Sequence, residues 1–98
     1  MITKTNVQST ATLVSAARAR NWFILQNQSD VDIFVAFTSD GGSVTGSTGA
    51  KPGILISAGE EIGMGQLPGG AGERFATNLA IYAIHESTGD KVLVCHEG

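Results

Sequence analysis

The amino-acid sequence predicts an all-β domain: a small antiparallel β-sandwich or jelly-roll-like barrel of about seven short strands. Ninety-eight residues are enough for one domain and too few for two. Short runs of β-branched and aromatic residues recur along the chain, and 13 glycines separate them. Helix signals are nearly absent. Only residues 15–20 combine good helix formers with a serine N-cap, and that stretch is long enough for about one turn or for a turn between strands.

The strands are expected where apolar runs stand between turn-forming residues. Residues 31–37 give the clearest run, and 22–26 give a strong aromatic and β-branched one. The last long run, 76–85, is built around Leu79, Ile81 and Ile84. In chain order, the expected strands cover residues 7–14, 22–26, 31–37, 54–57, 60–64, 76–85 and 92–96.

The segments between these runs predict two hairpins, one long loop and an arm. Residues 27–30 and 87–90 contain turn formers, so each is expected to join its flanking strands as a hairpin. Residues 38–53 form a glycine-rich stretch without apolar periodicity, and loops of this length are usually functional or disordered. Residues 1–17 hold few large apolar side chains and are expected to be an extended N-terminal arm, preceding a single sandwich domain over 18–98.

The expected hairpin of residues 22–37 has two apolar faces. Side chains alternate along a strand, so one face carries Trp22, Ile24 and Ile33 and is expected to face the core. The other face carries Phe23, Leu25 and Phe34, although a solvated sheet face should be polar. Three interpretations follow: the long loop and the arm cover this second face, another subunit does, or it forms a ligand groove.

Charge and cysteine content restrict the function classes. The net charge of −3 argues against general nucleic-acid binding. Residues 1–29 nevertheless carry Lys4, Arg18 and Arg20 and no acid, so this third could dock on an acidic neighbour or simply be solvated. A single cysteine, Cys95, cannot form an internal disulfide. We find neither an apolar run long enough to span a membrane nor a secretory signal, and expect folding in a cytoplasm.

The residues that could carry chemistry do not converge in the expected fold. His85 and His96 would lie about 15 Å apart in the closing hairpin. Cys95 and His96 are adjacent and would point to opposite faces, as would Glu60 and Glu61. Zinc needs three or four converging ligands, and paired carboxylates must face each other across a cleft. We therefore expect no metal, no cofactor and no catalytic residue, and hence not an enzyme.

Three segments together resemble a known family. They are RARNWFILQNQSDVDIFVAF, which precedes the glycine-rich loop, then PGILISAGEEI, and finally the closing AIYAIHESTGDKVLVCHEG. From about Arg18 onward the chain resembles the small β-sandwich structural proteins of tailed bacteriophages, most of all the capsid decoration, or cement, proteins. The motifs are patterns of residue type rather than invariant signatures.

The resemblance implies a virion component that is made in the host cytoplasm and binds the outer capsid surface. Such a protein binds the major capsid protein, bridges capsid subunits as a homotrimer, and needs neither nucleic acid nor a membrane. An alternative is a tail or head-fibre accessory module that binds a receptor or carbohydrate through residues 38–53. A small β-barrel or cupin-like enzyme is a third class. The residues expected at a subunit or capsid interface are Lys4, Arg18, Arg20, Phe23, Leu25 and Phe34.

Overall fold

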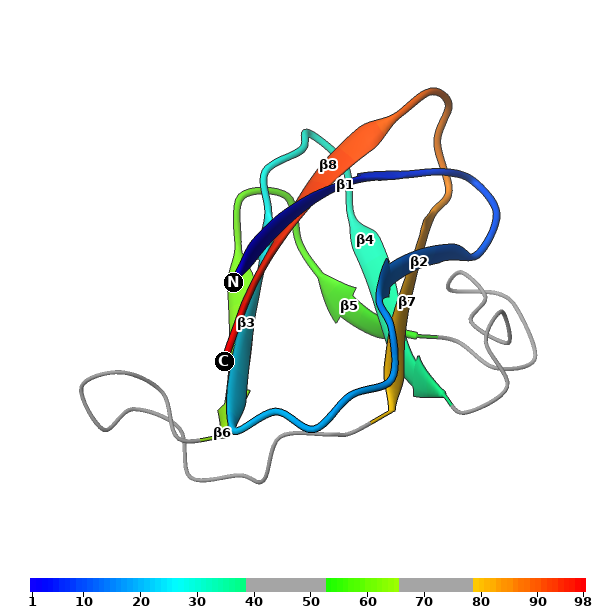
Figure 1. Cartoon of the computed structure of the whole chain (residues 1–98). Helices are drawn as coiled ribbons and strands as arrows, with labels where there is room; N and C mark the ends of the chain where they lie inside the picture. The colour runs from blue at the N-terminus through cyan, green and yellow to red at the C-terminus, as the bar shows by residue number, and fades with distance from the viewer. Residues whose placement is uncertain (39–52, 66–78) are drawn as a thin grey trace.

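The computed structural model describes residues 1–38, 53–65 and 79–98 (Figure 1). These residues form strands and connections, and none of them is helical, so residues 15–20 do not form a helical turn. The expected loop at 38–53 lies almost wholly outside the described residues. The strands are β1 (Ile2–Val7), β2 (Thr12–Ser15), β3 (Trp22–Asn27), β4 (Ile33–Thr38), β5 (Ile54–Ile56), β6 (Glu61–Gly65), β7 (Ala80–His85) and β8 (Lys91–Glu97).

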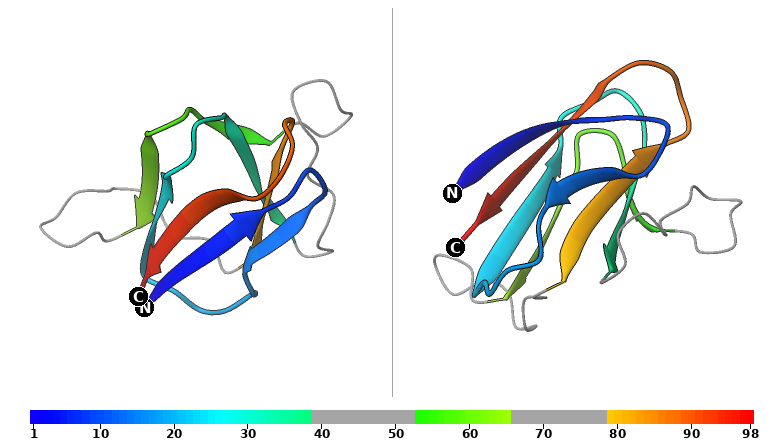
Figure 2. Two further views of the ribbon diagram at one scale, coloured as in Figure 1. Left: turned by 90° about the horizontal axis from the view of Figure 1, so that it is seen from above. Right: turned by 45° about the vertical axis from the view of Figure 1, so that its right-hand side comes forward.

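The strands form two antiparallel sheets of four that face each other (Figure 2). Sheet A has the order β1-β8-β3-β6, and sheet B has the order β2-β7-β4-β5. Consecutive strands lie in opposite sheets, except for β4 and β5, which are neighbours in sheet B. This interleaved order is that of an eight-stranded jelly roll, a double-sheet fold of two Greek keys. The predicted all-β sandwich is therefore confirmed.

Neither of the two predicted hairpins forms. β3 and β4 belong to opposite sheets, as do β7 and β8, so residues 28–32 and 86–90 cross from one sheet to the other. In sheet A, β3 pairs instead with β6 and β8, where Leu25 lies opposite Ile62 on one side and Cys95 on the other. Turn-forming residues allow the chain to reverse, but they do not determine which strand lies beside the next one.

The absence of the first hairpin reverses the predicted faces of β3. Phe23 and Leu25 are 0% exposed and lie in the core, whereas Trp22 and Ile24 are half-buried on the outward side. The rings of Phe23 and Phe37 meet edge to face, with centroids 5.5 Å apart, and link the two sheets. Phe23 and Leu25 therefore stabilise the chain's own core, and the prediction that they contact another subunit is wrong.

Residues 1–17 are part of the domain rather than an arm. β1 pairs along its whole length with β8, from Ile2 opposite His96 to Val7 opposite Lys91, and β2 pairs with β7. Val7 is 0% exposed and Val14 is 5% exposed, and both belong to the core. The predicted strand over 7–14 is wrong because residues 8–11 turn between β1 and β2. The described part of the chain thus forms eight strands rather than about seven.

The core lies between the inward faces of the two sheets. Two turns at its ends use glycines with positive φ, Gly59 at 80° and Gly89 at 77°, a conformation that residues with a Cβ rarely adopt. The core consists of Val7, Val14, Phe23, Leu25, Ile33, Val35, Ile56, Ile81, Ala83, Leu93 and Cys95.

Candidate interaction surfaces

The six predicted interface residues do not come together in the structure. Phe23 and Leu25 are in the core, and Arg20, which belongs to the connection from β2 to β3, is buried. Lys4 is exposed on β1, at the edge of sheet A, while Phe34 lies on sheet B. Arg18 keeps 42% of its side chain exposed. Only Lys4, Arg18 and Phe34 therefore remain candidates for outward contacts, and they belong to different surfaces.

The outward side of sheet B is an apolar surface. Strand register aligns Leu13, Tyr82 and Ala36 in one row across β2, β7 and β4. The adjacent row runs across β7, β4 and β5 and has Phe34 at its centre, 8% exposed. At the two rims, Leu13 and Leu55 are 48% and 49% exposed. This surface, called the apolar face below, consists of Leu13, Phe34, Ala36, Leu55, Tyr82 and Ile84.

The outward side of sheet A carries charged and polar side chains as well as apolar ones. Lys4, Gln26 and Glu61 share one row across the sheet, together with Val94. The Gln26 amide donates a 3.0 Å hydrogen bond to Glu61 Oε2, and its Oε1 lies 3.1 Å from His96 Nε2. His96, Gln26 and Glu61 thus form a hydrogen-bonded chain over β8, β3 and β6, called the polar ladder below. The outward side of sheet A therefore carries charged groups that the apolar face lacks, although Ile2, Trp22 and Ile24 lie there too.

A buried ionic cluster closes one end of the sandwich. The Glu97 carboxylate, whose side chain is 3% exposed, accepts hydrogen bonds from Arg20 Nε at 2.9 Å and Arg18 Nη1 at 3.3 Å. Ser15 Oγ lies 3.0 Å from both carboxylate oxygens and accepts a hydrogen bond from Arg20 Nη2. Arg20 also donates to the carbonyls of Ala16 and residue 79, both at 2.9 Å. This saturated network holds strand ends together and offers no free group for chemistry.

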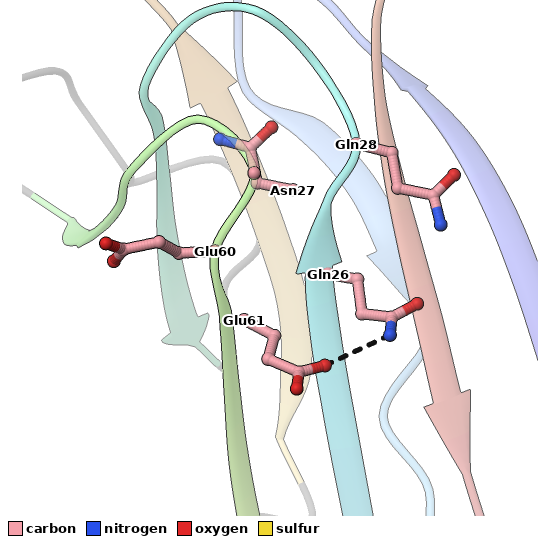
Figure 3. Close-up of a pocket in the computed structure, with 6 residues that line it drawn as sticks. Gln26, Asn27, Gln28, Glu60 and Glu61 are labelled. Atoms are coloured by element: carbon pink, nitrogen blue, oxygen red, sulfur yellow. Dashed lines mark hydrogen bonds between the residues drawn. The ribbon is translucent and has the colours of Figure 1, made fainter.

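A hollow of about 510 Å³ lies where β3 ends and β6 begins. Figure 3 shows that its side chains diverge: Glu60 and Gln28 point to opposite sides, and the bond drawn joins Gln26 to Glu61. Asn27 is 1% exposed, and its amide donates to the carbonyls of residues 31 and 56, at 2.8 Å each. Asn27 therefore organises the crossing from β3 to β4. The hollow lacks the convergent polar groups of a preformed ligand site. It is lined by Gln26, Asn27, Gln28, Gly59, Glu60 and Glu61.

His85 and Cys95, two of the possible metal ligands, are structural residues. His85 is 1% exposed, its Nδ1 accepts a 3.0 Å hydrogen bond from Ser87 N, and its Nε2 therefore donates to the Gly89 carbonyl at 2.7 Å. Cys95 is buried, and this burial raises the pKa of its thiol to about 11. Within the described residues, no three His, Cys, Asp or Glu side chains group as a metal site would require.

Comparisons with known proteins leave the family open. No family model matches the chain, and neither a curated protein nor a solved structure matches it significantly. In the part of the chain that the structure describes, no helix is long and apolar enough to cross a membrane.

Proposed function

We propose that this protein is a structural component of a tailed-phage virion that binds the outer capsid surface and bridges capsid subunits. The resemblance of residues 18–37, 52–62 and 80–98 to decoration proteins supports the proposal. The jelly-roll strand order is compatible with it, since viral capsid proteins use this fold, as do lectins and cupins. The fold supports the proposal only by analogy, because function depends on the surfaces that a fold carries.

The observation that carries the proposal is the contrast between the two outward faces of the sandwich. A bridging protein has to engage more than one neighbour, and it needs a separate surface for each. Here an uncharged apolar face lies on sheet B, and Lys4 with the polar ladder lies on sheet A, across the core. An enzyme would instead need convergent reactive groups.

The capsid contact in this proposal is made by the outward side of sheet A. Lys4 is exposed there, whereas Arg18 lies near the start of β1, where its Nη1 is 3.5 Å from Met1 Sδ and 3.3 Å from Glu97 Oε1. These cations belong to the 29 N-terminal residues that contain no acid. They suit an acidic patch of a major capsid protein, and such exposed charge contacts weaken as salt screens them.

Stabilisation of a shell by such a small protein follows from multivalency. Each exposed contact is worth only a few kcal/mol, but several contacts made by one oligomer raise the effective concentration for each later one. A protein that binds the assembled shell and not its separated subunits then stabilises the shell by mass action.

The test is the binding of purified protein to heads that lack it. Wild-type protein is expected to co-sediment with the heads and to raise the temperature at which they release DNA. Lys4→Gln and Ser9→Glu both give a net charge of −4, but Ser9 lies in the turn between β1 and β2. Lys4→Gln is expected to weaken binding and Ser9→Glu to preserve it. Absence of binding, or labelled protein confined to phage tails, would overturn the proposal and favour a receptor- or carbohydrate-binding module.

A further inference from the structure

We propose that β1 pairs along its free edge with an extended segment of another protein that carries a carboxylate, and that this segment adds a strand to sheet A. β1 is the first strand of sheet A, and among the described strands only β8 pairs with it. The inference goes beyond the proposed function because it requires no capsid and concerns the edge of sheet A rather than its outward side. Strand addition of this kind combines main-chain hydrogen bonds with side-chain selectivity.

The hydrogen-bond pattern shows which backbone groups of β1 are free. The Met1 carbonyl accepts a hydrogen bond from Glu97 N at 2.9 Å, and the Met1 amino group donates to the Glu97 carbonyl at 2.7 Å, so these two residues form a hydrogen-bonded pair. In an antiparallel ladder such pairs alternate with pairs that are not hydrogen-bonded. The odd-numbered residues of β1 therefore bond to β8. The N–H and C=O groups of the even-numbered ones point to the free edge, and these residues are Ile2, Lys4 and Asn6.

The free edge of β1 suits strand addition better than the other described edges. β1 has six residues in one continuous register, whereas β2 has four residues and a register shift, and β5 has three residues. β6 has five residues, but two of them are glycines, which weaken a strand. Near β2, the Asn6 carbonyl accepts a 3.4 Å hydrogen bond from Gln8 Nε2. A partner strand can therefore bond to both backbone groups of Ile2 and Lys4 and to the N–H of Asn6.

Charge favours an acidic strand over a second copy of β1. Full-length antiparallel pairing of two β1 edges would place the two Lys4 side chains opposite each other, and like charges in that position destabilise a sheet. Edge lysines are one means by which proteins prevent such self-pairing. A carboxylate opposite Lys4 is stabilised instead. Arg18, 42% exposed and near Met1 at the start of β1, adds a second cation, and residues 1–29 contain no acid.

The number of contacts determines the expected strength. Each hydrogen bond adds only a modest net amount, because the free backbone groups are already hydrated. We therefore expect a short peptide to bind with a dissociation constant on the order of 1 mM. A carboxylate opposite Lys4 is expected to improve the affinity by about two- to fivefold.

The test is an NMR titration of the isotope-labelled full chain with a capped peptide of alternating threonine and valine that carries one central glutamate. The amide signals of the even-numbered residues of β1 are expected to shift more than those of the odd-numbered ones, whose N–H groups bond to β8. In the matched control peptides, alternate amides are N-methylated. Methylation of the set that includes the glutamate amide removes the donors that face β1 and should weaken binding at least tenfold. Methylation of the other set should preserve binding.

A charge reversal tests the role of Lys4. Lys4→Glu is expected to bind a peptide with a central lysine better than the glutamate peptide, by about two- to fivefold. Gln28→Glu adds an acid at an exposed residue outside β1 and should keep the wild-type preference. Lys4→Gln should bind both peptides equally and repeats the test should Lys4→Glu fail to fold.

Three results would overturn the inference: shifts that do not alternate along β1, equal binding of the two methylated peptides, or an unchanged preference for glutamate in the Lys4 variants. Because no heads are present, failure of this experiment leaves the capsid-binding test intact. Failure to bind heads, in turn, leaves the peptide result unaffected.

Discussion

The Arg20 guanidinium and the Glu97 carboxylate form an ion pair, 2.9 Å from Nε to Oε2, whose side chains are only 1% and 3% exposed. The pair joins the connection after β2 to the end of β8, residues that lie 77 positions apart in the chain. Taking both charges out of water is costly, so the pair adds little net free energy to the stability of the fold. Each charge is tolerated in the interior because the other is present to neutralise it.

Removing one partner of this pair is expected to be strongly destabilising. Arg20→Met or Glu97→Leu leaves one buried charge uncompensated and should lower the free energy of unfolding by about 3–5 kcal/mol. The double variant Arg20→Met with Glu97→Leu should recover a large part of that loss. Urea unfolding of the four proteins gives the coupling energy. Strictly additive losses would contradict the interpretation. Asp30→Asn, in the exposed pair with Lys91, is the control and should change stability little.

The buried Cys95 thiol predicts a loss of stability at alkaline pH. Its pKa rises from 9.0 to about 11 in the folded protein because burial disfavours the thiolate. The unfolded chain therefore ionises first, and the contribution of the thiol is complete below pH 9 and decreases as pH rises towards 11, by at most about 3 kcal/mol. The measurement is the difference in unfolding free energy between wild type and Cys95→Ala, from pH 7.5 to 10.5. A difference that stays constant over this range would refute the prediction.

Substitutions at the two ends of β1 test whether residues 1–17 are an integral part of the folded domain. Val7→Ala deletes buried methyl groups from the core and should destabilise the protein by roughly 2 kcal/mol. Ile2→Ala, on the same strand but 69% exposed, should change stability by less than about 0.5 kcal/mol. Thermal and urea unfolding measure both effects. If Val7→Ala were as harmless as Ile2→Ala, β1 would be a loosely attached arm.

The imidazole of His85 is expected to hold the turn between β7 and β8. His85→Ala leaves Ser87 N and the Gly89 carbonyl without their partner and opens a cavity, so we expect a loss of about 2–4 kcal/mol. His96→Ala, a half-buried histidine on the outward side of sheet A, is the matched control and should cost less than about 1 kcal/mol. Hydrogen exchange in residues 86–90 should accelerate in the first variant and not in the second.

Local patterns were sufficient to predict the fold class but not the strand partners. The alternation in residues 31–37 predicted a strand, and β4 covers most of it. The predicted hairpin after Asn27 was wrong, because the chain crosses there from sheet A to sheet B. The Asn27 side-chain amide donates a hydrogen bond to the Ile56 carbonyl of sheet B. The apolar face was foreseeable only in Phe34 and Ala36. Its other members come from β2, β5 and β7, and only the strand order brings them together.

The partners of buried polar groups were equally hidden in the sequence. Arg20 was predicted as an interface cation because no acid lies within the first 29 residues. Its counter-ion, Glu97, comes from the last strand, and nothing in local spacing connects the two. Sequence patterns detect periodicity well, whereas pairs that are distant in the chain require the topology.

The strand order also has a consequence for the rate of folding. Of the six pairings between described strands, only β4 with β5 joins neighbours in the chain, so loop closures must precede most native contacts. High contact order of this kind is associated with folding in milliseconds to seconds. The chain ends lie side by side in both views of Figure 2, and β1 pairs with β8. A circular permutant that links residue 98 to residue 1 would convert this longest-range ladder into a hairpin, and it should fold faster than the parent chain.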